Sequence, residues 1–361
     1  MNTFKHVLAL IEPVSLPRLE GISRFAREHR WNLLLGDRLT RSVNDWTGDG
    51  VLVTLRRGSP LIGVVRSLRR RGIPVVDMTI ECPGVRLPRV ISDHAAIGRI
   101  AGEHFLQRGF LHLAWFSSNW TEVHRLRYAG FAAVCDARPA RLTQTTLRTR
   151  LVKLPNPCGV LAYNDSDAAL VLDAARNQGL STPEDVSVLG IGDDPFLCEN
   201  QPIGISSVAQ DLAGGAYRAA ELLQRLMDGA TPPAAAALIP PGNVTLRAST
   251  DTLAHNNPIV RAALVYIHRS LSHAFGAAEV AESIGLTRPR LDHLFADKVG
   301  HSVGREILRQ RLLRVKHLLK DPSLGIGEIA AACGFCNVGY LTNTFHRETG
   351  LTPTLWRQSV T

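Results

Sequence analysis

The chain has 361 residues, too many for one ordinary domain; at roughly 100–200 residues each, two or three domains are expected. It is 45% hydrophobic and 20% charged with a mean hydropathy of +0.02, a globular composition that excludes wholesale disorder. The 41 Lys and Arg residues outnumber the 32 Asp and Glu residues, and the resulting net charge of +9 favours a polyanionic partner.

The N-terminal segment and the cysteines predict a cytoplasmic protein. The apolar run 7–11 is too short for a signal-peptide core, and no segment approaches the roughly 18 apolar residues of a membrane helix. Six scattered cysteines are typical of reduced thiols. Cys333 and Cys336 form a C-x-x-C whose alternatives are zinc binding, redox chemistry or small residues in a tight joint. Because no second pair stands at ligand spacing, we expect the joint, with no metal and no cofactor.

The residues up to about Ser249 alternate apolar strand-like runs with helix-length segments. Continuous apolar strands separated by amphipathic helices indicate parallel sheets covered on both faces. Strands are expected at 7–11, 31–35, 50–55, 73–78, 111–117, 159–163, 186–191 and 243–250, and helices at 95–108, 166–178 and 212–227. The pattern restarts near residue 95. We therefore predict an α/β bilobed receptor of two doubly wound parallel-sheet lobes, with ligands beyond the strand carboxyl ends.

The pattern changes after residue 250. We place a ligand-binding domain at 1–250, a polar linker at 251–258 and an all-α domain at 259–361. From Asn256 onward there are 13 Lys or Arg and 8 Asp or Glu residues, a net charge of +5 within a short segment. The positive charge is therefore concentrated toward the C-terminal end of the chain.

The segment 277–300 predicts a helix, a turn and a second helix. Gly285 opens the turn, and Pro289 falls in the first turn of the second helix, where a missing amide hydrogen costs nothing. Leu291 and Phe295 face inward. The start of such a second helix enters the DNA major groove in helix-turn-helix proteins. The outward residues expected there are Arg288, Arg290 and His293.

The arrangement recurs over 326–353, with Gly334 in the turn and Leu341 and Phe345 inward. Asn can bond adenine and Arg can bond guanine through two hydrogen bonds each. The outward residues expected in this copy are Asn337, Tyr340, Asn343, Thr344 and Arg347. Each polar residue alone could belong to a solvated helix face, but the recurrence favours double-stranded DNA as the partner. Between the copies, 303–320 predicts one long Arg-rich helix that would contact phosphates.

These motifs resemble the DNA-binding domain of the AraC/XylS family of bacterial transcription regulators. The chain keeps Glu328-Ile-Ala, Gly334-Phe335 and Phe345, followed by Gly350, Thr352 and Pro353. The first half resembles the ligand-binding core of the LacI/GalR repressors through 87–109, 125–131, 162–165 and 183–190. A sensor of this kind before an AraC-type domain is the order found in regulators of xylose catabolism.

The resemblance implies a small neutral sugar or polyol effector, with a xylose-like pentose favoured. Sugar hydroxyls both donate and accept, so their site needs carboxylates, amides and an Arg at strand ends. The expected ligand-binding residues are Asp77, Arg127, Asn164, Asp165, Asp193, Asp194 and Gln210. Helix capping is the alternative role for Asp165. The chain departs from the xylose regulators at Gly192, where they usually have Asp, and at Leu16, where an Arg is common, although Arg18 stands two residues later.

We therefore predict a sequence-specific transcription regulator whose DNA binding is controlled by a sugar, and not an enzyme. The alternatives are a sugar-processing enzyme, a solute receptor, and the same regulator with a non-sugar effector. The chain lacks H-E-x-x-H, phosphate-loop and G-x-S-x-G motifs, and its 13 histidines have no metal spacing. A solute receptor would need an export signal and no DNA domain. The resemblance implies a homodimer in which lobe closure resets the paired DNA-binding domains, and RNA polymerase as a partner if the protein is an activator.

Overall fold

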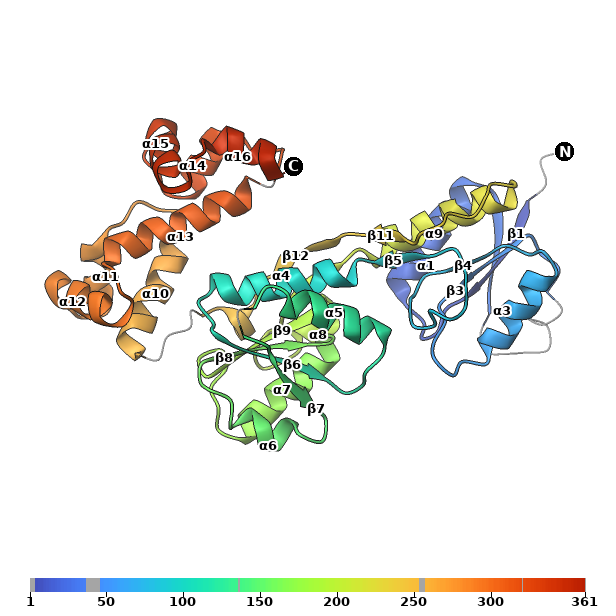
Figure 1. The fold of residues 1–361 in the computed structure, drawn as a ribbon, viewed down its shortest axis with the longest axis horizontal. Helices are drawn as coiled ribbons and strands as arrows, with labels where there is room; N and C mark the ends of the chain where they lie inside the picture. The colour runs from blue at the N-terminus through green and yellow to red at the C-terminus, as the bar shows by residue number, and fades with distance from the viewer. Residues whose placement is uncertain (1–3, 37–45, 136, 253–256, 320, 361) are drawn as a thin grey trace. The chain divides into compact units, whose positions relative to one another are not determined.

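The computed structural model describes residues 4–36, 46–135, 137–252, 257–319 and 321–360, which form two compact units (Figure 1). The first unit holds the residues up to Leu106 and His112–Asp251, and the second holds Gln107–Leu111 and the residues from Thr252 onward. Residues 253–256 of the predicted linker lie outside the described residues. No helix in the described ranges is both long and apolar enough to cross a membrane.

The first lobe of the N-terminal unit is a parallel sheet of strand order β2-β1-β3-β4. The strands are β1 (Lys5–Leu10), β2 (Trp31–Leu35), β3 (Gly50–Val53) and β4 (Val75–Asp77). Successive β1 residues point to opposite faces of the sheet, as expected for a strand buried on both sides. Val7 packs with α1 (Leu16–Glu28) and α9 (Leu212–Met227), whereas Leu8 packs with α3 (Leu61–Arg70).

The second lobe is a six-stranded sheet of order β12-β10-β9-β8-β6-β7, in which only β12 runs antiparallel to its neighbour. Its strands are β6 (His112–Ser117), β7 (Ala140–Thr143), β8 (Cys158–Ala162), β9 (Val186–Gly192), β10 (Ser206–Gln210) and β12 (Pro241–Thr245). The helices around it are α4 (His94–Gln107), α5 (Glu122–Ala132), α6 (Leu147–Leu151), α7 (Asp165–Asn177) and α8 (Pro195–Glu199). The two predicted parallel-sheet lobes are confirmed.

Two glycines bring helices α4 and α5 close together. A Cβ atom at Gly98 would collide with the carbonyl of Arg127, and one at Gly130 with the carbonyl of Ala95. Only glycine allows backbones to approach this closely. The contact fixes the position of α5, which carries Arg127 toward the carboxyl end of β8.

The chain crosses between the lobes three times, after β5 (Val90–Ser92), after β10 and after β11 (Ala237–Ile239). Strands β5 and β11 pair in parallel along these crossovers. The predicted strand 243–250 is wrong in its second half, because Ala248–Thr250 forms a 3₁₀ turn, η1. The hydroxyl of Ser249 there donates to the Val188 carbonyl at 2.6 Å and accepts from the Ser206 amide at 2.8 Å. These buried bonds hold η1 on the six-stranded sheet.

The C-terminal unit is helical, as predicted. Its helices are α10 (Pro258–Ser270), α11 (Ala277–Ser283), α12 (Arg288–Lys298), α13 (Val303–Leu318), α14 (Ile326–Ala332), α15 (Val338–Thr349) and α16 (Pro353–Val360). Helix α13 contributes residues to two separate hydrophobic cores. Val303 and Ile307 pack with α10–α12, and Leu312 and Val315 pack with α14 and α15. The predicted long helix is therefore present, and Lys320 at its expected end lies outside the described residues.

Candidate functional site

The buried guanidinium of Arg127 lies at the centre of a polar cluster in the N-terminal unit. Its side chain donates to the Tyr163 carbonyl at 2.5 Å and to Gln210 Oε1 at 3.0 Å. Its Nε lies 3.4 Å from His94 Nδ1. Arg127 is 5% exposed, and all three partners are neutral. The structure thus brings the predicted residues Arg127 and Gln210 together.

Aromatic rings form one wall of this cluster. The rings of His124 and Tyr163 are stacked, with centroids 3.6 Å apart and planes 10° apart, and the Arg127 guanidinium lies 4.7 Å from the Tyr163 centroid. The positive charge of a guanidinium is attracted to such a ring face. Burial, followed by the charge of Arg127, lowers the pKa of His124 to about 4. His124 is therefore neutral at physiological pH.

The four-stranded lobe contributes Arg18 and Glu81 to the same region. The Thr121 hydroxyl, at the start of α5, donates to Glu81 Oε1 at 2.8 Å, and this bond joins the two lobes. The other carboxylate oxygen of Glu81 is buried without a hydrogen-bond partner. Arg18 is close enough to Tyr163 and Asp77 to interact with them electrostatically, and burial lowers its pKa. We call Arg18, Glu81, His94, His124, Arg127, Tyr163 and Gln210 the cleft cluster.

The predicted acidic residues are already bound to other protein groups. Asp77 is fully buried and accepts from Thr79, the Leu55 amide and, at 3.2 Å, Arg89. Asp165 accepts from the Ser207 hydroxyl at 2.5 Å and the Asp194 amide at 3.0 Å. Burial, as the largest cause, raises the pKa of both carboxyls. Their positions at the strand ends match the prediction, but their oxygens are occupied.

The carboxylate of Asp193 binds residues outside the cleft cluster. Its backbone has φ of +56°, and its carboxylate bonds Arg247 at 2.8 Å and the Thr245 hydroxyl. Asn164 and Asp194 accept hydrogen bonds from the first turns of α7 and α8, at 2.7 Å and 2.9 Å. These three predicted residues therefore have structural partners in this conformation.

Sequence reasoning did not assign five members of the cleft cluster. Tyr163 follows β8 directly, so its strand-end position was an available signal, whereas Arg18 lies in the first turn of α1. His94 begins α4, where the chain enters the second lobe. Glu81 and His124 lie in segments whose sequence offers no comparable signal.

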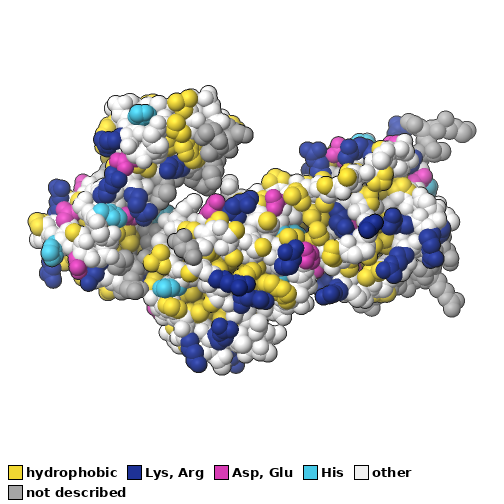
Figure 2. All heavy atoms as spheres, in the orientation of Figure 1, with side chains coloured by type: hydrophobic (Ala, Val, Ile, Leu, Met, Phe, Trp, Pro, Cys, Tyr) yellow, Lys and Arg dark blue, Asp and Glu magenta, His cyan; other side chains and the backbone are white. Residues whose placement is uncertain are grey.

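The first predicted recognition helix, α12, presents its polar residues to solvent. Arg288, Arg290 and His293 are exposed, whereas Leu291 and Phe295 are fully buried. Asp292 accepts from the Val303 amide at 3.2 Å and so joins α12 to the start of α13. Lys and Arg side chains also reach the surface at several points over the helices of this unit (Figure 2).

The second recognition helix, α15, begins at a capped turn. The side chain of Asn337 accepts from the Tyr340 amide at 2.7 Å, which leaves its NH₂ group near the helix start. Tyr340, Asn343 and Arg347 are exposed as predicted. The prediction that Thr344 points outward is wrong. It is 1% exposed, because it lies one helical turn after the buried Leu341 and beside Phe345 in the core.

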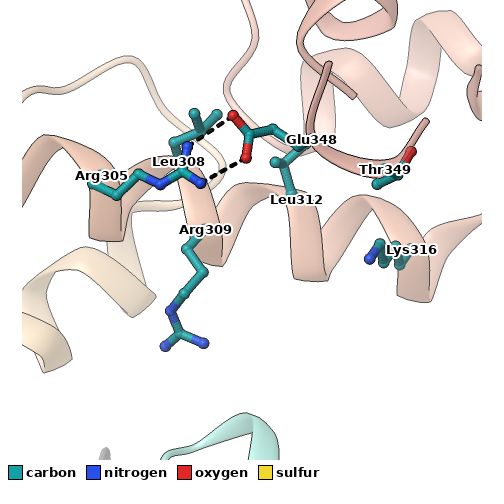
Figure 3. Close-up of a pocket in the computed structure, with 7 residues that line it drawn as sticks. All are labelled: Arg305, Leu308, Arg309, Leu312, Lys316, Glu348 and Thr349. Atoms are coloured by element: carbon teal, nitrogen blue, oxygen red, sulfur yellow. Dashed lines mark hydrogen bonds and ion pairs between the residues drawn. The ribbon is translucent and has the colours of Figure 1, made fainter. Parts of the chain in front are cut away.

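A pocket of about 140 Å³ lies between α13 and α15 (Figure 3). Arg305 forms a bidentate ion pair with Glu348 across this pocket, with both nitrogen–oxygen distances at 2.7 Å. Arg309 turns to the buried Glu306, which also accepts from His301 and Gln310 at 2.7 Å each. Two of the predicted phosphate-contacting arginines are therefore held by carboxylates on this helix surface.

The C-x-x-C pair lies in the turn before α15. Cys333 is fully buried, and burial raises its pKa to about 11, whereas Cys336 is exposed. Within the described ranges, no group of three or more His, Cys, Asp or Glu side chains is arranged to hold a metal ion. Cys333 packs as a small core residue beside Ile329 and Phe345.

Comparison with known proteins finds a domain family that matches each unit. The family described as "Periplasmic binding protein-like domain" matches residues 103–250, and that described as "Helix-turn-helix domain" matches residues 280–359. The Xylose operon regulatory protein of Escherichia coli K12 is 24% identical over 94% of this chain and 92% of its own length. The transcriptional activator RhaR of Cronobacter sakazakii is 39% identical over 24% of this chain and 29% of its own length.

Solved structures share the fold. The structure of the xylose-binding transcription activator xylR has a TM-score of 0.61 at 23% identity, covering 99% of this chain and 98% of that one. The complex of the regulator CelR with cellobiose has a TM-score of 0.58 at 20% identity, covering 69% of this chain and 86% of that one. These relatives are named as transcription regulators. The chain is therefore a DNA-binding transcription regulator that joins a periplasmic binding protein-like domain to a helix-turn-helix domain.

Proposed function

We propose that the N-terminal unit binds a sugar or polyol at the cleft cluster. The observation behind this proposal is that both lobes contribute side chains to one cluster. One lobe supplies Arg127, Tyr163 and Gln210, and the other supplies Arg18 and Glu81. Donors, acceptors and aromatic faces at strand carboxyl ends suit a polyhydroxylated molecule. The relatives named for xylose and cellobiose support the same class of effector. We propose that the carboxylate and amide side chains around the cleft cluster support it: Asp77, Asn164, Asp165, Asp193 and Asp194.

The C-terminal unit would read DNA through α12 and α15. The base-reading residues we propose are Arg288, Arg290, His293, Asn337, Tyr340, Asn343 and Arg347. Effector binding would favour one arrangement of the lobes, because a ligand shifts a conformational equilibrium only by its differential affinity. We infer that the protein acts in the cytoplasm as a homodimer, with RNA polymerase as a partner when it activates transcription. The resemblance to xylose operon regulators supports this mechanism.

The test is calorimetric titration of the full chain with a panel of pentoses, hexoses, polyols and sugar acids. Arg127→Ala should weaken binding of the sugar that binds the parent protein by about tenfold or more, because lost charged hydrogen bonds cost roughly 1.5–3 kcal/mol. DNA binding without sugar should be unchanged. Arg125→Ala is the matched control, since Arg125 is on the same helix, is exposed, and forms an ion pair with the neighbouring Glu122. Normal titration of Arg127→Ala would place the pocket elsewhere.

A further inference from the structure

A basic surface lies along one edge of the six-stranded lobe. Residues 137–156 contain five Lys or Arg residues and no Asp or Glu. All five side chains are exposed, and none forms an ion pair with a described residue. On the face seen in Figure 2, Lys and Arg side chains lie over the part of the lobe that carries α6. We call this surface the basic edge: Arg138, Arg141, Arg148, Arg150 and Lys153.

Contacts around Trp120 and Tyr128 bring side chains of the basic edge together. The Cζ atom of Arg141 lies 3.7 Å from the Trp120 ring centroid and 5.7 Å from that of Tyr128. Arg138 Nε donates to the Tyr128 hydroxyl at 3.3 Å, and Arg150 donates to the Arg141 carbonyl at 3.2 Å. A guanidinium that stacks on a ring keeps its N–H groups, which lie in its plane, available for other acceptors. The Arg141 donors are therefore held in place while remaining available.

The carboxylates of the neighbouring helices do not neutralise the basic edge. Glu122 in α5 and Asp173 in α7 each form an ion pair with an Arg of the same helix. Asp165 and Asp167 are buried at the start of α7. With all of these charges counted, and that of Asp136, which lies outside the described residues, residues 118–177 hold eight Lys or Arg and five Asp or Glu. The side of the lobe formed by α5, β7, α6 and α7 is therefore positive overall.

Protection of a sheet edge accounts for only part of this charge. Strand β7 is the last strand of the six-stranded sheet, and a charged side chain on such a strand prevents pairing with another chain. Arg141 is the one charged residue of β7. Arg148 and Arg150 lie on α6, and Lys153 follows that helix. The charge of these three residues calls for another account.

The C-terminal unit brings a polyanion to the same chain. Duplex DNA carries one negative charge per about 1.7 Å of its axis, and Lys and Arg are its usual phosphate partners. Because both units belong to one chain, bound DNA is present at a high effective concentration for the N-terminal unit, so individually weak contacts suffice. We propose that the basic edge binds the phosphate backbone of the same duplex, outside the base pairs that the C-terminal unit reads. The N-terminal unit would then contribute to DNA affinity without contributing to base specificity.

The experiment measures how the affinity of the full chain for DNA depends on duplex length. Fluorescence anisotropy uses duplexes that carry one site, selected from a randomised library, with flanks of increasing length. The basic-edge variant combines Arg148→Gln, Arg150→Gln and Lys153→Gln. At low salt the parent should bind the longest duplex more tightly than the shortest by about tenfold or more, and the variant should gain less than about twofold. Each lost phosphate contact should also reduce the slope of log affinity against log salt by about 0.9.

The matched control combines Arg66→Gln, Arg69→Gln and Arg70→Gln on α3, which removes the same charge from exposed positions of the other lobe. It should respond to flank length as the parent does. Replacing Arg148 and Arg150 by Lys should preserve the gain, because phosphate contacts depend on the charge. Equal gains in the parent and the basic-edge variant would overturn the proposal, as would an equal loss in the α3 control. A basic-edge variant that binds every duplex normally but no longer activates transcription would overturn it in favour of a protein partner.

Discussion

The buried carboxylate of Glu306 is a single residue on which the stability of the C-terminal unit should depend. Burial alone would raise its pKa, but hydrogen bonds from Arg309, Gln310 and His301 and the charge of Arg309 hold the pKa below the ordinary 4.5. A lowered pKa in the folded state stabilises the fold above the unfolded pKa, and this contribution is lost as pH falls through the folded value. Acid below about pH 4.5 should therefore weaken this unit selectively.

Glu306→Gln should lower the free energy of unfolding of the C-terminal unit by about 1–3 kcal/mol at pH 7, because it removes the charge that three donors share. Urea denaturation at pH 7 and at pH 3 measures this, and the difference between parent and variant should shrink at the lower pH. Glu282→Gln is the control at an exposed helix position and should change stability by less than about 0.5 kcal/mol. A loss that is independent of pH would contradict the electrostatic account.

The residues of the cleft cluster show where prediction from sequence stops. Arg127 and Gln210 were identified because each lies at a recognisable strand end or motif. The partner of Asp193 was not, because Arg247 lies 54 residues later and reaches it only after β12 folds back on β10. A carboxylate looks the same in sequence whether it is free or paired. Only the structure shows which groups these carboxylates bind.

At the scale of elements, the two helix turns offer a matched comparison. Gly285 and Gly334 occupy equivalent turns with φ of +69° and +67°. A Cβ atom at Gly285 would meet nothing within 4 Å, whereas one at Gly334 would lie 2.5 Å from the His273 carbonyl. Gly285→Ala should cost about 1–2 kcal/mol from backbone strain alone. Gly334→Ala should cost more than about 2 kcal/mol, because the α10 end must also shift; equal losses in thermal unfolding would show that the contact relaxes freely.

The recognition helices should divide their work between bases and phosphates. Arg290→Ala in α12 or Asn343→Ala in α15 should cost about 1–3 kcal/mol and relax preference at one base position. Arg309→Ala should instead weaken all sequences alike if Arg309 leaves Glu306 to contact phosphate. Binding to a randomised operator library measures both quantities. Identical specificity in all three variants would mean that other residues read the bases.

Long elements were easier to predict than short ones. Helix α9 spans Leu212–Met227 as predicted, since an apolar stripe repeats along its four turns. Strands β5 and β11 have three residues each, too few to show a period, and they were missed. The end of the strand prediction at 243–250 failed because Ser249 and Thr250 bond to β10 instead of continuing a ladder. Each failure involves a residue whose partner is distant in sequence.

At the scale of the whole molecule, the C-terminal unit should bind DNA by itself. It has its own two cores, and its residues from Asn256 onward carry a net charge of +5. A fragment of residues 252–361 should bind duplex DNA with an affinity that falls steeply as salt rises. Electrophoretic mobility shift at several salt concentrations tests this. A folded fragment that does not bind at low salt would refute DNA recognition by this unit.

The η1 turn determines which lobe carries the DNA-binding unit. The chain leaves the receptor from Ser249 and Thr250, which are bonded to β9 and β10 of the six-stranded sheet. Along the chain, β12 and η1 of the six-stranded lobe therefore stand between the four-stranded lobe, which supplies Arg18 and Glu81, and the predicted linker. In the proposed homodimer, a movement of the four-stranded lobe would act on the DNA-binding unit by changing the surface that this lobe presents to the other subunit. The response of DNA binding to sugar should accordingly tolerate a linker that is longer by a few residues better than a remodelled outer surface of the four-stranded lobe.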